Sequence, residues 1–270
     1  MPVDADAEVL SNTKLSAEYD VLAFLAPDLG AALRPGQFVM IRTGPGDTPL
    51  LRRPYSVFER LRGADGTVIG FSILNKRVGA GSALLFEAAP GQRFSCLGPL
   101  GRPFTPVAPP AAAWMVAGGT GLAPFATLAE RFAADGVGST LFYGARTGGE
   151  LFCVELFDRL GVRTVLATED GSRGDAGRVT VPLARDLAAR PRTSPLALYA
   201  CGPAGMLKAV AGLASAFGRP CEVATERQMG CGMGGCYSCV VRVRMPDGAA
   251  RYARSCLEGP VFRAEDLVWD

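Results

Sequence analysis

The 270-residue sequence contains no histidine. Histidine is the usual general acid or base near neutral pH and a common metal ligand, so this chain must obtain those chemistries from other groups. A bound cofactor that carries the reaction removes this need, because the protein then supplies only position and electrostatics. The missing side chain therefore favours cofactor-based transfer over acid–base catalysis by the protein itself.

The chain also lacks a long apolar run and an excess of charge of either sign. Residues 1–8 are acidic and contain no apolar core of a signal peptide, and no stretch of about 18 uncharged apolar residues follows. The 28 basic and 26 acidic residues are interspersed without a polybasic block. We therefore expect a cytoplasmic protein with no membrane span and no nucleic-acid partner.

Cysteine is plentiful, and half of the eight cysteines form one motif. Cys231, Cys236, Cys239 and Cys256 follow the pattern C-x4-C-x2-C-x16-C, which is the plant-type ligand spacing of a [2Fe-2S] cluster. Intervening glycines let backbone N–H groups approach the cluster sulfurs. A structural zinc site, two disulfides or ordinary buried cysteines are the alternatives, although zinc ribbons usually have two separated C-x2-C pairs. The motif predicts an electron-transfer protein.

The segment between the third and fourth cysteines has the pattern of a β-hairpin. Residues 240–244 alternate like a strand, Pro246-Asp247-Gly248 is typical of a turn, and residues 251–254 can return as a second strand. A turn centred on the Asp-Gly bond would place Cys239 opposite Cys256. The other cysteines have no ligand spacing and are expected to be small buried residues. They are Cys96, Cys153, Cys201 and Cys221.

The first hundred residues read as short strands separated by glycine and proline turns, which indicates a small antiparallel barrel. A proline-rich segment at residues 102–111 follows and is expected to be a linker. The six expected strands are residues 9–14, 19–25, 37–42, 56–61, 67–74 and 93–97.

After the linker, strands alternate with helices, which predicts a doubly wound parallel sheet. Strands are expected at residues 114–117, 140–143, 163–167 and 196–200, and helices after residue 121, at 150–160 and at 204–217. We therefore expect three domains: a barrel over 1–101, an α/β domain over 102–221 and a cluster domain over 222–270. The last unit is small enough to need its metal for folding.

Two barrel segments have the chemistry of a nucleotide site. Arg53-Pro54-Tyr55-Ser56, expected just after the third strand, combines a cation for a diphosphate with an aromatic ring and a hydroxyl. Gly79 to Ser82, expected to precede a short helix at 83–86, offers the N–H groups of Gly81 and Ser82 to a phosphate. Each segment alone could equally be a charged surface turn.

Two strand-to-helix turns point to a second nucleotide site. Gly118-Gly119-Thr120-Gly121 joins a buried strand to a helix, where a pyrophosphate can approach the backbone. Cys201-Gly202-Pro203 ends a later strand at the same carboxyl edge. Plain turns are the alternative for both. Arg146 lies near where a ribose 2′-phosphate could sit, or is a solvated charge, and does not rank NAD against NADP.

Together these segments resemble the ferredoxin-reductase-like flavoproteins over nearly the whole chain. Within that group they look most like the electron-transfer subunits of the NAD-dependent, class B dihydroorotate dehydrogenases. The segments that carry this second resemblance are the four-cysteine block, Gly79–Ser82, Leu97–Gly101, Thr168–Ser172 and Glu226–Met229.

The resemblance implies a barrel that binds FAD, an α/β domain that binds NAD and a domain with a [2Fe-2S] cluster. Lys76 or Arg77 would meet the FAD diphosphate, and Cys201 would lie near the nicotinamide. Members of this family commonly have threonine in place of Ser82 and an aliphatic residue in place of Tyr55. Ser82 keeps the needed hydroxyl, and Tyr55 keeps an apolar surface. The implied FAD residues are Arg53, Pro54, Tyr55, Ser56, Leu74, Asn75, Lys76, Gly81 and Ser82, and the NAD residues are Gly118, Gly119, Thr120, Gly121, Cys201, Gly202 and Pro203.

The implied function is electron transfer in pyrimidine biosynthesis. Flavin, which exchanges a hydride with a nicotinamide and single electrons with a cluster, would connect NAD to a partner protein. By resemblance that partner is an FMN-containing dihydroorotate dehydrogenase catalytic subunit, in an assembly with two copies of each chain. One alternative is an NAD(P)H-dependent reductase subunit that serves sulfur, sulfite, ferredoxin or a hydrogenase. Another is a zinc-stabilised binding or scaffold protein.

Overall fold

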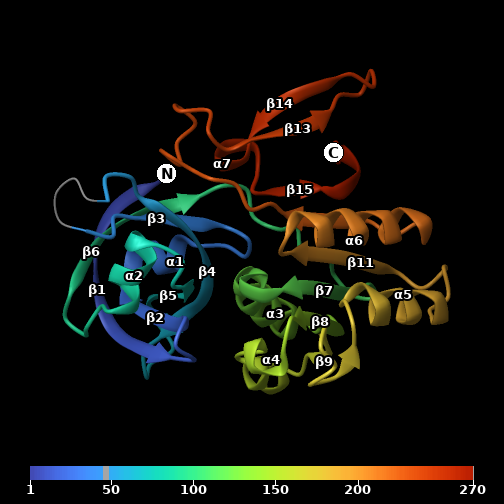
Figure 1. Ribbon diagram of the computed structural model, residues 1–270, viewed down its shortest axis with the longest axis horizontal. Coiled ribbons are helices and arrows are strands. Elements are labelled where there is room, and N and C mark those ends of the chain that lie inside the picture. The colour runs from blue at the N-terminus through green and yellow to red at the C-terminus, as the bar shows by residue number, and fades with distance from the viewer. Residues whose placement is uncertain (45–48, 270) are drawn as a thin grey trace.

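A closed six-stranded barrel forms the N-terminal part of the computed structural model, which describes residues 1–44 and 49–269 (Figure 1). The strand order is β1-β2-β5-β4-β3-β6, and all neighbours are antiparallel, which confirms the predicted barrel. Its elements are β1 (Val3–Lys14), β2 (Tyr19–Leu25), α1 (Pro27–Ala32), β3 (Phe38–Ile41), β4 (Arg53–Arg62), β5 (Val68–Lys76), α2 (Ala80–Phe86) and β6 (Arg93–Leu100).

The barrel closes because alternate side chains of its strands point inward. In β6 every second residue from Phe94 is buried, so the alternation in the sequence becomes one apolar wall. Phe24 of β2 and Phe71 of β5 stack inside at 5.4 Å between ring centroids. Gly70 is required beside them, since a Cβ there would lie 1.8 Å from the carbonyl oxygen of Phe24.

Two predicted boundaries in the barrel were wrong, and both concern the expected flavin segments. The fourth strand begins at Arg53 and not at the expected residue 56, so residues 53–56 lie inside β4, where Ile41 pairs with Arg53 and Phe38 with Ser56. Helix α2 begins at Ala80, so Gly81 and Ser82 belong to its first turn. The Ser82 hydroxyl accepts the N–H of Gly79 at 3.0 Å, which extends the helix start N-terminally.

The second part of the chain forms a seven-stranded sheet of order β10-β9-β8-β7-β11-β12-β15. The first six strands in this order are parallel, as predicted, and β15 pairs antiparallel with β12. The order reverses between β7 and β11. The strands are β7 (Ala112–Gly118), β8 (Ser139–Ala145), β9 (Arg163–Thr168), β10 (Asp175–Ala176), β11 (Leu196–Cys201), β12 (Cys221–Ala224) and β15 (Val261–Arg263).

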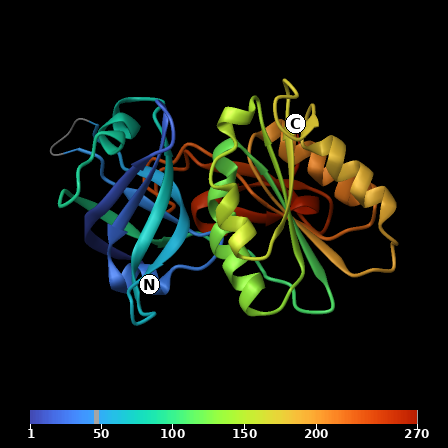
Figure 2. The same cartoon turned by 90° about the horizontal axis from the view of Figure 1, so that it is seen from below.

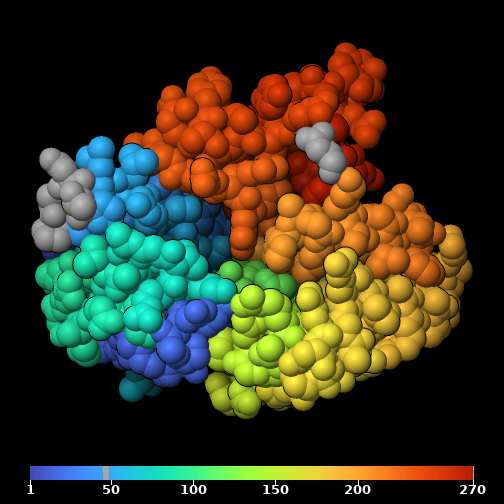
Figure 3. All heavy atoms as spheres, viewed as in Figure 1, coloured from blue at the N-terminus to red at the C-terminus, as the bar shows by residue number. Residues whose placement is uncertain are grey.

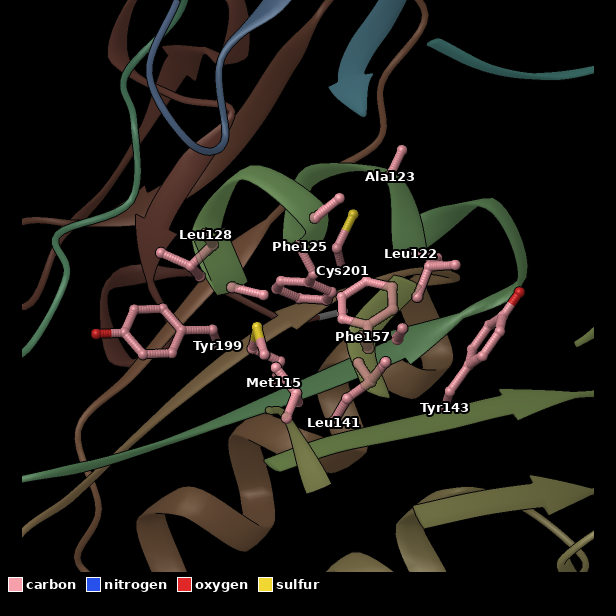
Figure 4. Packing of buried hydrophobic residues seen from close by; sticks show 14 of the residues in the cluster. Met115, Leu122, Ala123, Phe125, Leu128, Leu141, Tyr143, Phe157, Tyr199 and Cys201 are labelled. Carbon is pink, nitrogen blue, oxygen red and sulfur yellow. The ribbon is translucent and has the colours of Figure 1, made fainter. Parts of the chain in front are cut away.

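Helices cover both faces of this sheet. In Figure 2 the yellow-green helices α3 (Ala123–Ala134) and α4 (Val154–Arg159) stand between the sheet and the barrel. On the opposite face lie α5 (Thr180–Ala189) and α6 (Ala204–Ala216). Figure 4 shows the apolar core between the sheet and helices α3 and α4. In it, Phe125 of α3 and Phe157 of α4 pack over the strands that carry Met115 and Leu141.

The expected helix over 150–160 was wrong in its first half. A short 3-10 turn, η2 (Gly148–Glu150), comes first, and α4 begins only at Val154. Cys153 at the N-cap has φ of +56°, a left-handed conformation that an α-helix cannot include. No described helix of this chain is long and apolar enough to cross a membrane.

The C-terminal segment rests on both larger parts, as the orange-to-red atoms in Figure 3 show. It contains the hairpin β13 (Val240–Arg244) and β14 (Ala250–Arg254), then α7 (Ser255–Glu258), after which the chain rejoins the large sheet as β15 and ends in η3 (Ala264–Asp266). The domain boundaries stay a prediction, although β12 runs across the expected boundary between residues 221 and 222.

Candidate functional site: a cysteine loop beside a nucleotide cleft

The four motif cysteines lie at one end of the hairpin, where the loop after β12 meets α7. Cys239 and Cys256 are buried, at 2% and 1% exposure, whereas Cys231 is half-buried and Cys236 is exposed. The two buried cysteines pack against Met40 of β3 and its barrel neighbours. The loop is therefore held on the barrel, with its outer part open to solvent.

The hairpin register differs from the prediction by one residue. Val240 pairs with Arg254, and the backbone N–H of Ser255 donates to the carbonyl of Cys239 at 3.0 Å. Cys256 is therefore one residue beyond the position opposite Cys239, inside α7. The two cysteines still pack in one cluster against the barrel, so the hairpin brings the fourth cysteine to the loop as expected.

The thiols are arranged as two pairs, Cys231 with Cys236 and Cys239 with Cys256. Hydrogen bonds from Ser238 lower the pKa of Cys236 to about 6, and the Ser238 hydroxyl lies 3.1 Å from its sulfur. Burial, and the neighbouring Cys239, raise the pKa of Cys256 to about 12. Loss of the Cys256 proton therefore requires a strong positive charge, which a bound metal supplies.

Glycines in this loop allow the chain to pack closely, as an approach of backbone N–H groups to the cluster sulfurs requires. Gly234 has φ of +82°, and a Cβ there would lie 2.4 Å from Leu257 of α7. The N–H of Met233 donates to the Cys231 sulfur at 3.4 Å, so the backbone approaches a thiol directly. Such contacts are suited to a cluster with negatively charged sulfurs.

Within residues 1–44 and 49–269, no three His, Cys, Asp or Glu side chains converge as ligands of a single metal ion. A two-iron cluster does not require such convergence, because its four thiolates divide between two irons. The pairing of the four thiols fits this division. Which residues bind the cluster stays a prediction.

A cleft of about 820 Å³ opens where the barrel, the α/β domain and the cysteine loop meet. Most of the predicted flavin residues line it. Its barrel wall is formed by Phe38, Leu51, Arg53, Pro54, Tyr55, Ser56, Leu74 and Lys76, and the remaining walls by Thr120, Ala123, Thr225, Glu226, Arg227, Gln228, Met229, Gly230, Ser238 and Pro260.

The other predicted flavin residues lie directly behind this wall. Asn75 is fully buried, and its amide oxygen accepts the Tyr55 hydroxyl at 2.9 Å. Its amide nitrogen donates to the carbonyl of Ser82 at 3.1 Å. The same nitrogen also donates to Asp20 at 2.8 Å, a buried aspartate that sequence reasoning missed.

Two cationic side chains suited to a diphosphate line the barrel wall of the cleft. Arg53 lines the wall, and Gly81 keeps the space beside it open, because a Cβ at Gly81 would lie 3.2 Å from the Arg53 Nε. Lys76 also lines the cleft, with its Nζ 4.8 Å from the Tyr19 ring. Arg77 instead pairs with Glu87, so Lys76 fits the diphosphate role better.

The two glycine turns of the second predicted site lie together at the carboxyl edge of the sheet, at the point where its order reverses. A Cβ at Gly121 would lie 2.2 Å from the carbonyl oxygen of Cys201, so the turns are in direct backbone contact. A 3-10 turn, η1 (Gly119–Leu122), precedes α3. Open α/β sheets bind nucleotides at such reversal points.

Cys201 itself lies in the apolar core below this edge. Its side chain is 3% exposed and belongs to the core shown in Figure 4. Burial raises the pKa of its thiol well above the usual range, so the group is neutral. Its backbone, rather than its sulfur, is in position to contribute to a nucleotide site.

Sequence reasoning missed the role of residues 225–230, which form one wall of the cleft directly after β12. Glu226 faces the cleft, where solvent reaches it, and the surrounding protein raises the pKa of its carboxyl by desolvation. The signal in the sequence was weak: β12 is a four-residue strand that includes Glu222, and it places the following residues at the same carboxyl edge.

Arg146 follows β8 at this edge and is paired. Its Nη2 donates to the carboxylate of Glu150 at 2.7 Å, and its backbone N–H to the same group at 3.3 Å. The guanidinium lowers the pKa of Glu150. Any phosphate bound here would have to compete with that carboxylate.

The barrel, the parallel sheet with its glycine turns and the cysteine loop together define an oxidoreductase of the ferredoxin-reductase-like flavoprotein class. Residues 115–212 match the family model for an oxidoreductase NAD-binding domain. Residues 226–268 match the iron-sulfur cluster binding domain of dihydroorotate dehydrogenase B.

Curated relatives identify the family. The chain is 35% identical over 267 residues to the dihydroorotate dehydrogenase B (NAD(+)) electron transfer subunit of Desulforamulus reducens, covering 98% of each chain. It is 41% identical over 237 residues to that of Geobacillus thermodenitrificans, covering 87% of this chain and 86% of the relative. The chain belongs to the family of dihydroorotate dehydrogenase B electron transfer subunits.

Solved structures agree with this fold. An NADH-dependent reduced ferredoxin-NADP oxidoreductase superposes with a TM-score of 0.83 at 28% identity, covering 98% of this chain and 91% of that one. A ferredoxin NADP+ reductase from Neisseria gonorrhoeae superposes with a TM-score of 0.65 at 18% identity, covering 80% of this chain and 92% of that one, and shows the fold alone. The predicted oxidoreductase class, electron-transfer role and cofactors FAD, [2Fe-2S] and NAD are confirmed.

Proposed function

We propose that this chain passes electrons between NAD and a catalytic partner subunit that carries FMN and oxidises dihydroorotate. The name of its relatives supports such a partner, since they are electron transfer subunits of dihydroorotate dehydrogenase B. The single observation that carries the proposal is the composition of the cleft. It is lined both by Arg53 to Ser56 of the barrel and by Gly230 and Ser238 of the cysteine loop, so a flavin bound there lies beside the cluster.

The cleft fits a flavin dinucleotide in its chemistry. Its lining combines cationic side chains, a tyrosine with a hydrogen-bonded hydroxyl and apolar side chains. We assign the FAD to the nine predicted barrel residues between Arg53 and Ser82, NAD to the two glycine turns and the cluster to the four cysteines. When bound, the flavin supplies the conversion between a hydride, which carries two electrons, and single electrons.

The side chains of the protein have separate tasks in this arrangement. Arg53 and Lys76 neutralise diphosphate charge, and Tyr55 lines the cleft with its hydroxyl held by Asn75. Thr225 to Gly230 form a further wall of the cleft beside the cysteine loop. Cys239 and Cys256 hold the inner side of the cluster away from solvent, while Cys236 keeps the outer side accessible.

The surface around the outer cysteines is suited to a protein partner. Three large apolar side chains are exposed there: Met233 at 60%, Tyr237 at 61% and Leu257 at 45%. Apolar and aromatic groups of this kind are enriched at protein interfaces. We propose that the catalytic subunit docks on this surface, in a cytoplasmic assembly with two copies of each chain and without a membrane.

The experiment that tests this function combines the anaerobically purified chain with a purified FMN-containing dihydroorotate dehydrogenase catalytic subunit. We expect NAD+ reduction that depends on dihydroorotate and on both proteins, with two copies of each chain by light scattering. Replacement of Cys236 by serine should abolish this coupled reaction. Absence of NAD+ reduction with both wild-type proteins present would contradict the proposal.

A second candidate is a reductase subunit that serves another acceptor. The high structural similarity to an NADH-dependent reduced ferredoxin-NADP oxidoreductase favours ferredoxin as that acceptor over sulfur, sulfite or a hydrogenase. NADH-driven ferredoxin reduction without any dihydroorotate-dependent activity would support this candidate. A colourless protein containing zinc would instead point to a binding or scaffold protein.

A further inference from the structure

We infer that Asp20 is a positioning residue for the flavin site: through Asn75 it fixes the side chain of Tyr55, a residue that lines the cleft. The inference rests on the proposed flavin site. Asp20 lies on β2, behind the wall formed by β4 and β5, and does not line the cleft itself. It therefore acts on the ligand only through its neighbours.

The three residues form a continuous chain of hydrogen bonds from the interior to the cleft. Asp20 Oδ1 accepts from Asn75 Nδ2 at 2.8 Å, and Asn75 Oδ1 accepts from the Tyr55 hydroxyl at 2.9 Å. Asp20 and Asn75 are both fully buried. Buried hydrogen bonds of this kind hold a single arrangement, because no water can replace a missing partner.

The direction of these bonds follows from the partners of Asn75. Its amide nitrogen has two hydrogens, one for Asp20 and one for the carbonyl of Ser82 at 3.1 Å. A flipped amide would place its oxygen against the carbonyl oxygen of Ser82, which cannot donate. Asn75 Oδ1 must therefore face Tyr55, and the Tyr55 hydroxyl must donate to it.

A phenol has one hydrogen, so this bond uses the only donor of Tyr55. The remaining lone pairs of its oxygen can only accept. The orientation of the Tyr55 phenol is therefore set by Asn75. Asn75 also joins Tyr55 to Ser82 in the first turn of α2, so one buried amide aligns two separate parts of the predicted flavin site.

Asp20 has one further charged neighbour, Lys14, whose Nζ lies 3.7 Å from Asp20 Oδ2 and above the Phe86 ring. If Asp20 served only as a counter-ion for Lys14, loss of that lysine would affect the site equally. Lys14→Met separates the two roles. We expect it to leave FAD binding within about twofold of wild type.

The test measures FAD dissociation from the wild-type holoprotein and from six variants by the recovery of flavin fluorescence. Asp20→Leu keeps the volume and removes the acceptor, and we expect about three- to tenfold weaker FAD binding, the range that one hydrogen bond supplies. Asp20→Asn retains an acceptor oxygen and should recover part of this loss. Tyr55→Phe should weaken binding to a similar extent as Asp20→Leu.

The decisive comparison is the double variant Asp20→Leu/Tyr55→Phe. If Asp20 acts through Tyr55, the double variant should bind FAD no more weakly than Tyr55→Phe alone. Additive losses would show a merely structural effect and overturn the inference, as would an Asp20→Leu protein with wild-type affinity. The exposed Asp28→Asn serves as control. A wild-type protein without FAD would instead overturn the proposed function itself.

Discussion

Ser255 is the hairpin neighbour of Cys239: its backbone N–H donates to the Cys239 carbonyl oxygen at 3.0 Å. The hairpin loop explains this register. Met245 and Ala249 pair across a three-residue loop that ends in Gly248 with φ of +86°, so the turn is centred on Asp247. Cys256 consequently reaches the cluster loop from the first turn of a helix.

Moving the last thiol by one position tests this register. The Ser255 side chain is fully buried and lies 3.1 Å from the Thr225 hydroxyl, so a thiol there would be directed to Thr225. We expect Ser255→Cys/Cys256→Ser to lose the cluster, as measured by iron and sulfide per chain. Ser255→Ala, the control, should keep its iron. Full iron content in the double variant would show that either position can supply the ligand.

Loss of an outer cysteine should separate the cluster from the flavin. We expect Cys236→Ser to abolish the cluster spectrum while FAD remains bound and NADH still reduces it, because Cys236 does not line the cleft. Cys221→Ser is the control, since burial in β12 raises the pKa of that thiol to about 12 and keeps it inert. Simultaneous loss of FAD from Cys236→Ser would mean that loop and cleft fold as one unit.

The pairing of Arg146 with Glu150 predicts a preference for NADH over NADPH. Glu150→Gln leaves the Arg146 charge uncompensated, and we expect kcat/KM for NADPH to rise about fivefold relative to NADH, which corresponds to roughly 1 kcal/mol for one charge pair in water. Steady-state rates with both nucleotides provide the measurement. Glu155→Gln should leave the ratio unchanged. An unaltered ratio in Glu150→Gln would place the ribose away from Arg146.

Ion pairs between the barrel and α3 should contribute modestly to stability. Arg60 and Arg62 of β4 contact the two carboxylate oxygens of Glu130 at 3.0 and 3.2 Å. We expect Glu130→Gln to lower the free energy of unfolding by about 0.5–1 kcal/mol at low salt, and by less at high salt. Thermal unfolding at two salt concentrations measures this. Equal losses at both concentrations would rule out a charge effect.

Glu59 should make stability depend on pH. Desolvation raises the pKa of its carboxyl in the folded protein above the ordinary value of 4.5. The folded state then binds more protons than the unfolded state, so this group makes the protein more stable as the pH falls through the folded pKa towards 4.5. Glu59→Gln should be more stable than wild type at neutral pH, and the difference should shrink on acidification. Denaturant unfolding at several pH values measures it; a constant difference would contradict this origin.

Patterns with strict spacing could be predicted from the sequence. The cysteine motif follows from metal geometry, and the alternation in β6 from the two faces of a strand, so both were visible in a single chain. The turns at Gly118 to Gly121 and Cys201 to Pro203 were also placed at one edge correctly, because parallel strands end together.

Interactions between distant residues could not be predicted. Asp20 is one polar residue in an apolar strand, and its partner Asn75 is 55 positions away, so nothing local marks it as buried. Strand β15 has only three residues and forms because β12 provides an open edge. The hairpin register failed because a two-residue and a three-residue turn share the same Asp-Gly signal.

The return of the chain to the sheet at β15 affects how the protein responds to oxygen. Ala224 and Val261, at the two ends of the segment that carries the cysteines, are paired with each other in the sheet. Oxidative loss of iron would therefore leave both ends anchored and spare most of the entropy cost of closing the loop again. Iron and sulfide can then be supplied to a segment whose two ends are still held by the sheet.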